Sequence, residues 1–213
     1  MRIIPMMALL ALASGPVAAA SWQIGDNDGY GAGICDNCQH PFNGSTANYD
    51  GRSAAEMIAT DGTQYTDTYS TTHPGFSPHG SETVATFSFT GLGNSWTVGH
   101  LEIDMADFQA SIGGSVITTF NGIAQDFAYD DGFPNTFIRF YTLTGSVVDS
   151  INATGELVIT IDRNSSGDFY GFDYLKLSDI AAPVPEPETY AMLLAGLGLL
   201  GFANRRRMQN PVA

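Results

Sequence analysis

Two cysteines, Cys35 and Cys38, are the only thiol groups of this 213-residue chain, and two residues separate them. Before a βαβ pattern, a C-x-x-C pair would indicate redox chemistry. Here the pair lies in a Gly- and Asn-containing segment of a chain that its ends mark for export, which favours a small-loop disulfide. The alternative is a metal site in which both thiolates join His40 and a fourth ligand, His73 or His79. Its ligand spacing is irregular, and an oxidising compartment works against free thiolates.

A second candidate site is the acidic segment 26–29 (DNDG), which places two carboxylates and an amide on one tight turn. Hard cations such as Ca²⁺ require ligands of this kind, although the twelfth-position Glu of an EF-hand loop is absent. If the first and last strands of the fold are neighbours, an acidic residue near the end of the body completes the site. We therefore take Asp26, Asp28, Asp168 and Asp173 as candidate ligands of a structural Ca²⁺ ion, and expect no other cofactor. A solvated turn is the alternative, and residues 130–132 (DDG) carry a weaker version of the same signal.

Aromatic residues at loop-like positions form a third candidate feature. Flat rings beside Asp and Asn side chains suit sugar recognition, because the rings stack on CH faces while the polar groups bind hydroxyls. The alternative interpretation is that these rings pack the core or its rim. The residues are Tyr49, Tyr65, Tyr69, Tyr129, Phe133, Tyr170 and Tyr174.

Enzyme signatures are missing from the sequence. There is no G-x-S-x-G elbow and no H-E-x-x-H motif. Carboxylate pairs such as Glu102 with Asp104 carry little weight in a chain with 22 acidic residues. A G-x-G-x-x-G pattern at residues 196–201 follows no strand and lies in an apolar segment, which argues against a dinucleotide site. We predict a protein that is not an enzyme.

The N-terminus has the three parts of a secretory signal peptide. Arg2 precedes an apolar run from Ile3 to Ala13, and three alanines end at Ala20. A core this short, with a small-residue cleavage site, is typical of a cleaved signal and not of a membrane anchor. We predict a signal peptide at residues 1–20 that signal peptidase removes before Ser21.

The C-terminus changes composition abruptly. Residues 182–189 form a Pro-rich linker, and Tyr190–Ala203 is continuously apolar. As a helix this stretch spans about 21 Å, less than the ~30 Å hydrocarbon core of a bilayer. Its position directly before three arginines still favours membrane insertion with the arginines in the cytoplasm. We expect a C-terminal hydrophobic helix within residues 190–207.

This tail resembles the PEP-CTERM sorting signal in all three of its parts. The matching residues are Val184, Pro185, Glu186 and Pro187, then the apolar stretch, then Arg205, Arg206 and Arg207. The resemblance implies recognition by an exosortase, a membrane-embedded cysteine transpeptidase of Gram-negative bacteria. It implies an inner-membrane intermediate, cleavage near Pro-Glu-Pro, and delivery to the cell surface or extracellular matrix, in association with exopolysaccharide and biofilm. A membrane anchor that is never cut is the alternative.

The charge of the body, residues 21–181, excludes one class of partner. The body has 20 acidic and four basic side chains, which gives a net charge of −16. Such a surface repels the phosphates of nucleic acids and the headgroups of anionic lipids, so we expect no nucleic acid partner. Divalent cations, neutral glycans and simple solvation remain as interpretations of the acid excess.

The body has the composition and alternation of strands. It is rich in Gly, Thr, Ser, Asn, Asp and aromatic residues and poor in Lys, Glu and Leu. Period-2 patterns between turn signals indicate half-buried antiparallel strands. Only Ala54–Ala59 suggests a helical turn, capped by Ser53 with Glu56. The predicted strands are Thr83–Thr90, Thr97–Ile103, Val116–Phe120, Phe137–Leu143, Glu156–Ile161 and Phe172–Leu177.

These patterns predict an all-β body, an antiparallel β-sandwich of the jelly-roll type with about eight strands. The body also resembles small β-rich proteins that precede this tail, since residues 167–177 (GDFYGFDYLKL) end like a last jelly-roll strand before such a linker. This resemblance implies fold alone, similar to that of carbohydrate-binding jelly rolls. The leading function is an exported surface or matrix protein sorted by an exosortase. A carbohydrate-binding module is the first alternative, and a secreted hydrolase is the second.

Overall fold

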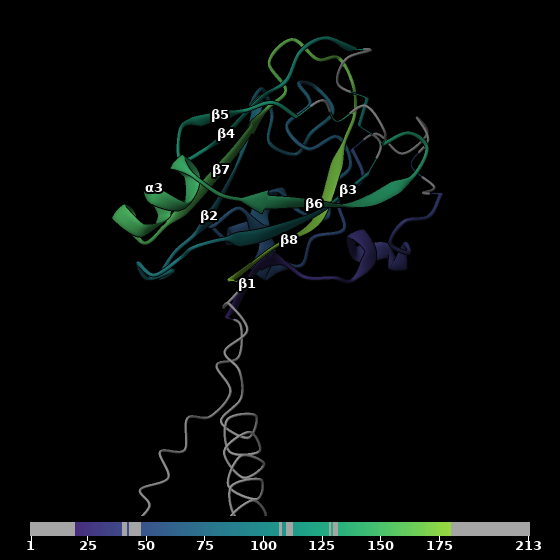
Figure 1. Ribbon diagram of the computed structural model, residues 1–213. Coiled ribbons are helices and arrows are strands. Elements are labelled where there is room, and N and C mark those ends of the chain that lie inside the picture. The colour runs from purple at the N-terminus through teal and green to yellow at the C-terminus, as the bar shows by residue number, and fades with distance from the viewer. Residues whose placement is uncertain are drawn as a thin grey trace, which may run out of the picture. The chain divides into compact units, whose positions relative to one another are not determined.

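Two antiparallel sheets of four strands each form the body (Figure 1). The computed structural model describes residues 20–179 except 40, 41, 43–47, 107, 110–112, 128, 130 and 131. The first sheet has the order β1-β8-β3-β6 and the second the order β2-β7-β4-β5. The strands of the first sheet are β1 (Ser21–Gly25), β3 (Gly99–Ala106), β6 (Thr136–Leu143) and β8 (Gly171–Asp179). Those of the second are β2 (Val84–Phe89), β4 (Ile117–Phe120), β5 (Ile123–Gln125) and β7 (Leu157–Asp162).

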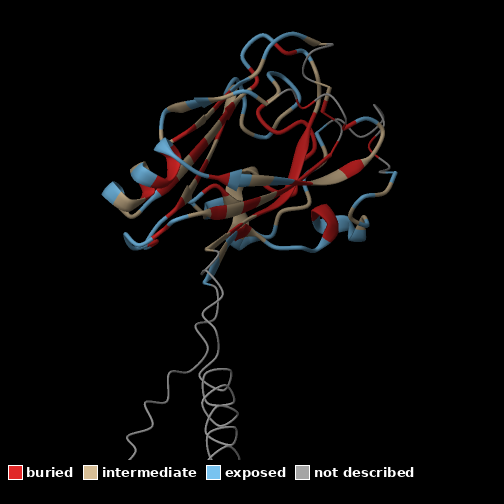
Figure 2. Cartoon of the chain, in the orientation of Figure 1, coloured by how far each residue is buried: buried red, intermediate tan, exposed pale blue. Residues whose placement is uncertain are grey.

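The core lies between the inner faces of the two sheets, where Figure 2 shows the buried positions. Along β7, Leu157, Ile159 and Ile161 are buried and alternate with partly exposed residues, as the period-2 pattern predicts. Phe87 of the second sheet meets Phe172 of the first edge-to-face, with ring centroids 5.0 Å apart. The prediction of an all-β antiparallel sandwich is confirmed. The jelly-roll connectivity is not, and it stays a prediction.

The first and last strands of the body are neighbours. Strand β1 pairs antiparallel with β8, so that Ser21 lies opposite Ser178 and Gly25 opposite Tyr174. This pairing brings the acidic segment that follows β1 close to the C-terminal part of the body. It is the arrangement on which the predicted Ca²⁺ site depends.

Helix α3 (Ser146–Thr154) shows that the expectation of a single helical segment was wrong. The residues Val147, Val148 and Ile151 form its buried face. Gly155 ends the helix in a left-handed conformation, with φ +71°, and donates its N–H to the Ile151 carbonyl. The spacing of the three apolar residues and the terminal glycine are helix signals, but the β-branched composition obscured them. Strands β1 and β5 were not predicted either.

Helix α1 (Ala54–Ile58) occupies the place where a helical turn was predicted. Ser53 and Glu56 form the expected capping box, in which each side chain accepts a hydrogen bond from the other residue's backbone N–H. The predicted signal peptide, Pro-rich linker and C-terminal helix lie outside the described residues. Within those residues, no helix is long and apolar enough to cross a membrane.

Candidate metal centre

A sharp turn follows β1 and presents two of the predicted ligands. Asp28 accepts a hydrogen bond through Oδ1 from the Gly31 N–H at 2.6 Å, at the start of the π-helical turn η1 (Gly29–Gly33). Gly29 has φ +75°, and a Cβ at this position would collide with the backbone nitrogen of Ile34. Only glycine fits this site. The turn thereby fixes Asp26 and Asp28 next to each other.

A buried polar segment, Thr66–Thr72, supplies a third carboxylate that the sequence analysis did not identify. Asp67 has φ +55°, an uncommon value for a residue with a side chain. Its N–H donates to the Phe172 carbonyl of β8 at 2.8 Å, and its carbonyl accepts from the Gly51 N–H at 2.7 Å. The backbone is therefore fixed on both sides. The side chain is fully buried, yet neither carboxylate oxygen has a hydrogen-bond partner in the protein.

Among the residues that the structure describes, Asp26, Asp28 and Asp67 form the first of two acidic groups, with ligand oxygen atoms all within 4.8 Å of one another. Glu56 of α1 also contacts the Asp67 carboxyl group. We call these four residues the Asp67 cluster. Burial and then the neighbouring Glu56 raise the pKa of Asp67 to about 10. Partial burial and the charge of Asp28 raise the pKa of Asp26.

Asp36, Asp104 and Asp173 form the second group, which we call the Asp104 cluster. Asp173 accepts hydrogen bonds from the backbone N–H groups of Tyr30, at 2.9 Å, and of Gly29, at 3.3 Å. Asp104 accepts one from the Tyr30 hydroxyl at 3.3 Å, whereas its Oδ2 is buried without a partner. Burial and then the charge of Asp173 raise the pKa of Asp104 to about 7. Burial raises the pKa of Asp173 to about 6, against the lowering effect of its two backbone hydrogen bonds.

An irregularity in the first sheet explains why Asp104 and Asp173 meet. Strands β3 and β8 are neighbours, and their register shifts between Ile103 and Met105. A bulge of this kind leaves one residue out of the ladder and turns its side chain. The extra residue lies in β8, where Asp173 and Tyr174 lie opposite Asp104 alone, so the carboxylate of Asp173 reaches the one on β3.

The structure divides the predicted Ca²⁺ ligands among three places. Asp26 and Asp28 lie in the Asp67 cluster, and Asp173 lies in the Asp104 cluster. Asp168 belongs to neither group: its Oδ2 accepts a hydrogen bond from the Gln109 N–H, and its carbonyl accepts one from Arg163. Sequence reasoning missed Asp67, Asp36 and Asp104 as ligands and noted Glu56 only as a helix cap.

The two cysteines lie outside both acidic clusters. Cys35 and Cys38 are joined by a disulfide. Their sulfur atoms are thus bonded to each other and are not available as metal ligands. His73 stacks on Phe169, with ring centroids 4.4 Å apart, instead of approaching the cysteines. His40 and the acidic pair at residues 130 and 131 lie outside the described residues.

Most of the loop-like aromatic residues pack in the interior. Tyr69, Tyr129, Tyr170 and Tyr174 are buried, and Tyr49 and Tyr65 are partly buried. Phe133 is 45% exposed. The core-packing interpretation therefore accounts for most of the set.

One segment of the chain matches a known family model. Residues 183–207 match the family model of the PEP-CTERM protein-sorting motif. A search of curated proteins finds no significant match. All three parts of the predicted tail lie in the matched range.

Solved structures resemble the body only distantly. The GH26-CBM35 β-(1,4)-mannanase of Podospora anserina is 18% identical with a TM-score of 0.31, over 48% of this chain and 20% of that chain. The ANX2 ectodomain of Arabidopsis thaliana is 12% identical with a TM-score of 0.32, over 49% and 32%. The ANX1 ectodomain of the same plant is 14% identical with a TM-score of 0.33, over 73% and 43%. This chain thus spans less than half the length of each.

The sorting motif indicates the destination of the protein. It lies at residues 183–207, directly after the β-sandwich body. Such a motif implies export and processing by an exosortase. The chain therefore carries a PEP-CTERM protein-sorting motif, which implies export and sorting to the cell surface by an exosortase.

Proposed function

We propose that the body acts outside a Gram-negative cell as a non-enzymatic surface or matrix protein associated with exopolysaccharide and biofilm. The observation that carries this proposal is the sorting motif at residues 183–207. Signal peptidase removes the N-terminal peptide, and the apolar tail holds an intermediate in the inner membrane. The exosortase then cuts near Pro-Glu-Pro and delivers the body to the surface or matrix.

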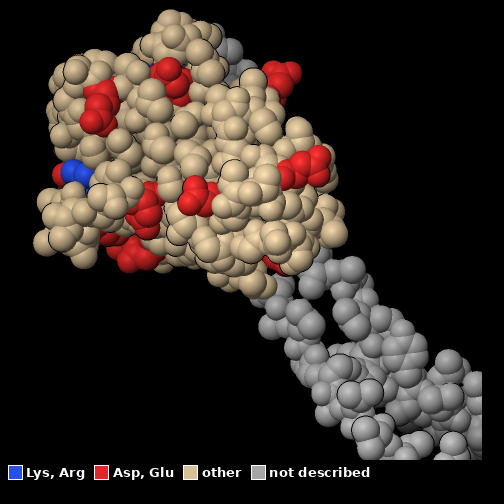
Figure 3. Space-filling view, turned by 90° about the vertical axis from the view of Figure 1, so that its left-hand side faces the viewer, with Lys and Arg blue, Asp and Glu red and all other residues tan. Residues whose placement is uncertain are grey.

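Two features of the body support a role without catalysis. Asp104 and Asp173, two carboxyl groups that lie together on the first sheet, are fully buried and accept hydrogen bonds from Tyr30. A carboxylate pair that hydrolyses a glycosidic bond must instead reach its substrate. The outer surface is acidic, and Figure 3 shows acidic side chains spread over one face with little basic surface between them. This charge suits solvation in a hydrated matrix.

Replacing Pro185, Glu186 and Pro187 by alanine is expected to leave export intact and to block sorting. The uncut protein should accumulate in the inner membrane, because its apolar tail and its arginines at 205–207 remain. Cell fractionation followed by intact mass measurement checks this. Glu188→Ala is the matched control, since it lies outside Pro-Glu-Pro, and it should reach the surface like the unaltered protein.

Arrival of the triple variant at the surface with normal mass would contradict the role of the motif. The unaltered protein provides a second check, because its surface form should lack the apolar tail. A surface form that still contains residues 190–207 would identify the tail as a permanent anchor.

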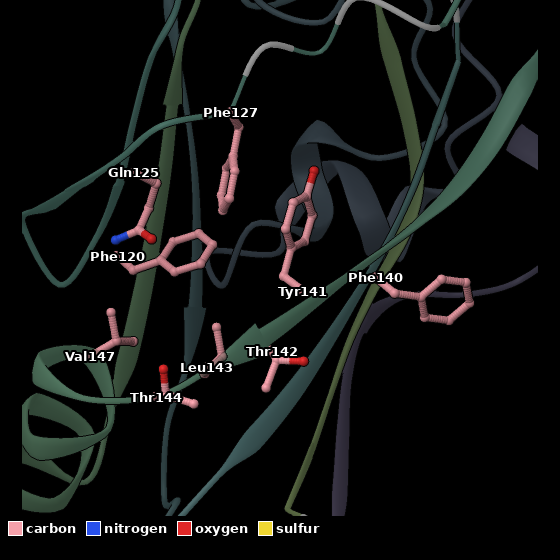
Figure 4. A pocket seen from close by; sticks show the side chains of 9 residues that line it. All are labelled: Phe120, Gln125, Phe127, Phe140, Tyr141, Thr142, Leu143, Thr144 and Val147. Atoms are coloured by element: carbon pink, nitrogen blue, oxygen red, sulfur yellow. The ribbon is translucent and has the colours of Figure 1, made fainter.

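A carbohydrate-binding module is the second candidate function, and a groove on the body favours it. The groove has a volume of about 300 Å³ and lies between β6 and the β4–β5 hairpin. Phe127 and Tyr141 face each other there, with ring centroids 4.2 Å apart, and Phe120 lies 5.6 Å from Phe127 (Figure 4). None of the lining residues is charged, which suits a neutral glycan.

Tyr141→Ala should weaken the binding of a neutral glycan at least tenfold if this groove is the site, because stacking area is lost. A glycan array with the full chain in detergent identifies a glycan, and titration of the variant measures the loss. Phe76→Ala is the control, since Phe76 is 41% exposed and packs against Phe169, away from the groove. If both variants bound the glycan equally well, the groove would not be the glycan-binding site. If no neutral glycan bound, the second candidate would be abandoned.

A further inference from the structure

We infer that the Asp67 cluster is a structural Ca²⁺ site, which joins the end of β1, helix α1 and the buried segment Thr66–Thr72. This inference is independent of the proposed surface function. It rests on the placement of the four carboxylates and on the environment of one of them.

The carboxylate of Asp67 is the observation that points to a cation. It is 0% exposed, and both of its oxygen atoms are buried without a hydrogen-bond partner. An ionised carboxylate in such a place is strongly unfavourable unless a charge compensates it. The basic residue nearest in sequence, Arg52, directs its guanidinium group to Asp50, with an N–O distance of 2.8 Å.

The contact between Asp67 and Glu56 adds to this argument. Glu56 is fixed by the N-cap of α1, because its Oε2 accepts the Ser53 N–H at 2.6 Å. Two carboxyl groups that touch are both acceptors when ionised, so either a proton or a cation must lie between them. The further carboxylates of Asp26 and Asp28 at the same place make a divalent cation the better partner.

The donor set favours a hard cation such as Ca²⁺ over Zn²⁺ and related ions. All four side chains offer oxygen, whereas Zn²⁺ and related ions favour nitrogen and sulfur. Ca²⁺ lies about 2.4 Å from its ligands, so two of its ligand oxygens are at most about 4.8 Å apart. The oxygens of Asp26, Asp28 and Asp67 meet this limit. Asp26 and Asp28 are exposed and leave room for water, which completes the six to eight ligands that Ca²⁺ takes.

A bound ion would hold together parts of the chain that are distant in sequence. Asp26 and Asp28 follow β1, and Glu56 belongs to α1. Asp67 is bonded through its own N–H to Phe172 of β8. Ca²⁺ outside the cell would therefore stabilise the whole side of the sandwich on which the chain's first and last strands pair.

The test uses the full chain, purified in detergent and freed of metal with EDTA. Both tryptophans of the chain, Trp22 and Trp96, lie in the body, so their fluorescence reports unfolding of the body alone. At a hundredfold excess of Ca²⁺ over its Kd, Tm should rise by roughly 5–10 °C. NaCl of equal ionic strength should give a much smaller rise. Calorimetric titration should show one ion per chain at this site.

Three variants make the test specific. Asp67→Asn keeps the shape of the side chain and removes the buried charge. It should lose the Ca²⁺-dependent rise, and in EDTA its Tm should exceed that of the unaltered protein. Asp26→Asn alters an exposed residue, which leaves the core intact, and should bind Ca²⁺ at least tenfold more weakly. Asp168→Asn, at the originally predicted ligand outside the cluster, should keep the full rise.

Several results would overturn the site. One is an equal rise in Ca²⁺ and in matched NaCl. Another is a full Ca²⁺-dependent rise in both Asp67→Asn and Asp26→Asn. Loss of the rise in Asp168→Asn alone would place the ion elsewhere. If Ca²⁺ had no effect on any form, the carboxyl groups of Asp67 and Glu56 would share a proton instead of a cation.

Discussion

Phe87→Ala is expected to lower the free energy of unfolding by about 3–5 kcal/mol, as large-to-small changes of a core phenylalanine do. Phe87 is fully buried on β2, and its ring meets Phe172 of the opposite sheet with centroids 5.0 Å apart. The variant removes a contact that holds the two sheets together and leaves a cavity. Urea unfolding, followed by tryptophan fluorescence, measures the change in free energy.

Phe140→Ala is the matched control for this prediction. The same residue type lies on β6 but is 70% exposed, and its side chain points away from Phe127 and Tyr141 (Figure 4). Its replacement should change the free energy of unfolding by less than about 0.5 kcal/mol. Similar losses in the two variants would contradict the assignment of inner and outer faces. The unfolding slope against urea should stay constant in both, because the same surface is exposed.

Alternation along the sequence was sufficient to predict six strands. In Thr83–Thr90 and Glu156–Ile161 every second residue is apolar, and these residues are the buried ones of β2 and β7. A strand with one buried face carries this signal in its own residues. The antiparallel sandwich therefore followed from local patterns alone.

Elements that depend on distant partners were missed. Strand β5 has only three residues, Ile123–Gln125, and is defined by its pairing with β4. Strand β1 follows the expected cleavage site directly and forms on its pairing with β8. Helix α3 contains β-branched residues that locally favour strands, and its buried face against the core decides its structure.

In the candidate metal centre, too, the ligands that are close in sequence were predicted, and those that depend on distant contacts were missed. Asp26 and Asp28 were predicted as ligands because they are close in sequence on one turn. Asp67 lies 39 residues beyond Asp28, and nothing in its local sequence indicates burial. Asp104 becomes a neighbour of Asp173 through the register shift between β3 and β8. The sorting motif was recognised fully because sorting signals are local and do not depend on the fold of the body.

A large pH effect should come from Asp104, whose folded-state pKa is raised to about 7 from 3.8, in addition to that of Asp67, whose pKa is raised to about 10. Burial is the main cause, and the charges of Asp173 and Asp36 add to it. Between about pH 4 and pH 7 the folded protein holds a proton on Asp104 that the unfolded chain has lost. The free energy of unfolding therefore falls as the pH rises through this range. Each unit of pKa difference corresponds to about 1.4 kcal/mol.

Asp104→Asn should remove the contribution of Asp104 to this pH dependence. Asparagine keeps an oxygen that can accept the Tyr30 hydroxyl, which lies 3.3 Å from Asp104 Oδ1, and it carries no charge at any pH. At pH 8 the variant should be more stable than the unaltered protein by on the order of 2–4 kcal/mol, and at pH 4 nearly equal to it. A slope should remain, because burial raises the pKa of Asp67 to about 10 and that of Asp173 to about 6.

Urea unfolding in EDTA at pH 4 to 8 measures this effect without interference from bound cations. Asp149→Asn on the exposed face of α3 is the control and should keep the slope of the unaltered protein. If Asp104→Asn also kept that slope, Asp104 would be ionised in the folded protein at neutral pH. Its buried Oδ2, which has no hydrogen-bond partner in the protein, would then need a compensating cation. The Asp104 variant in EDTA thus separates a cluster neutralised by protons from one that holds its charge.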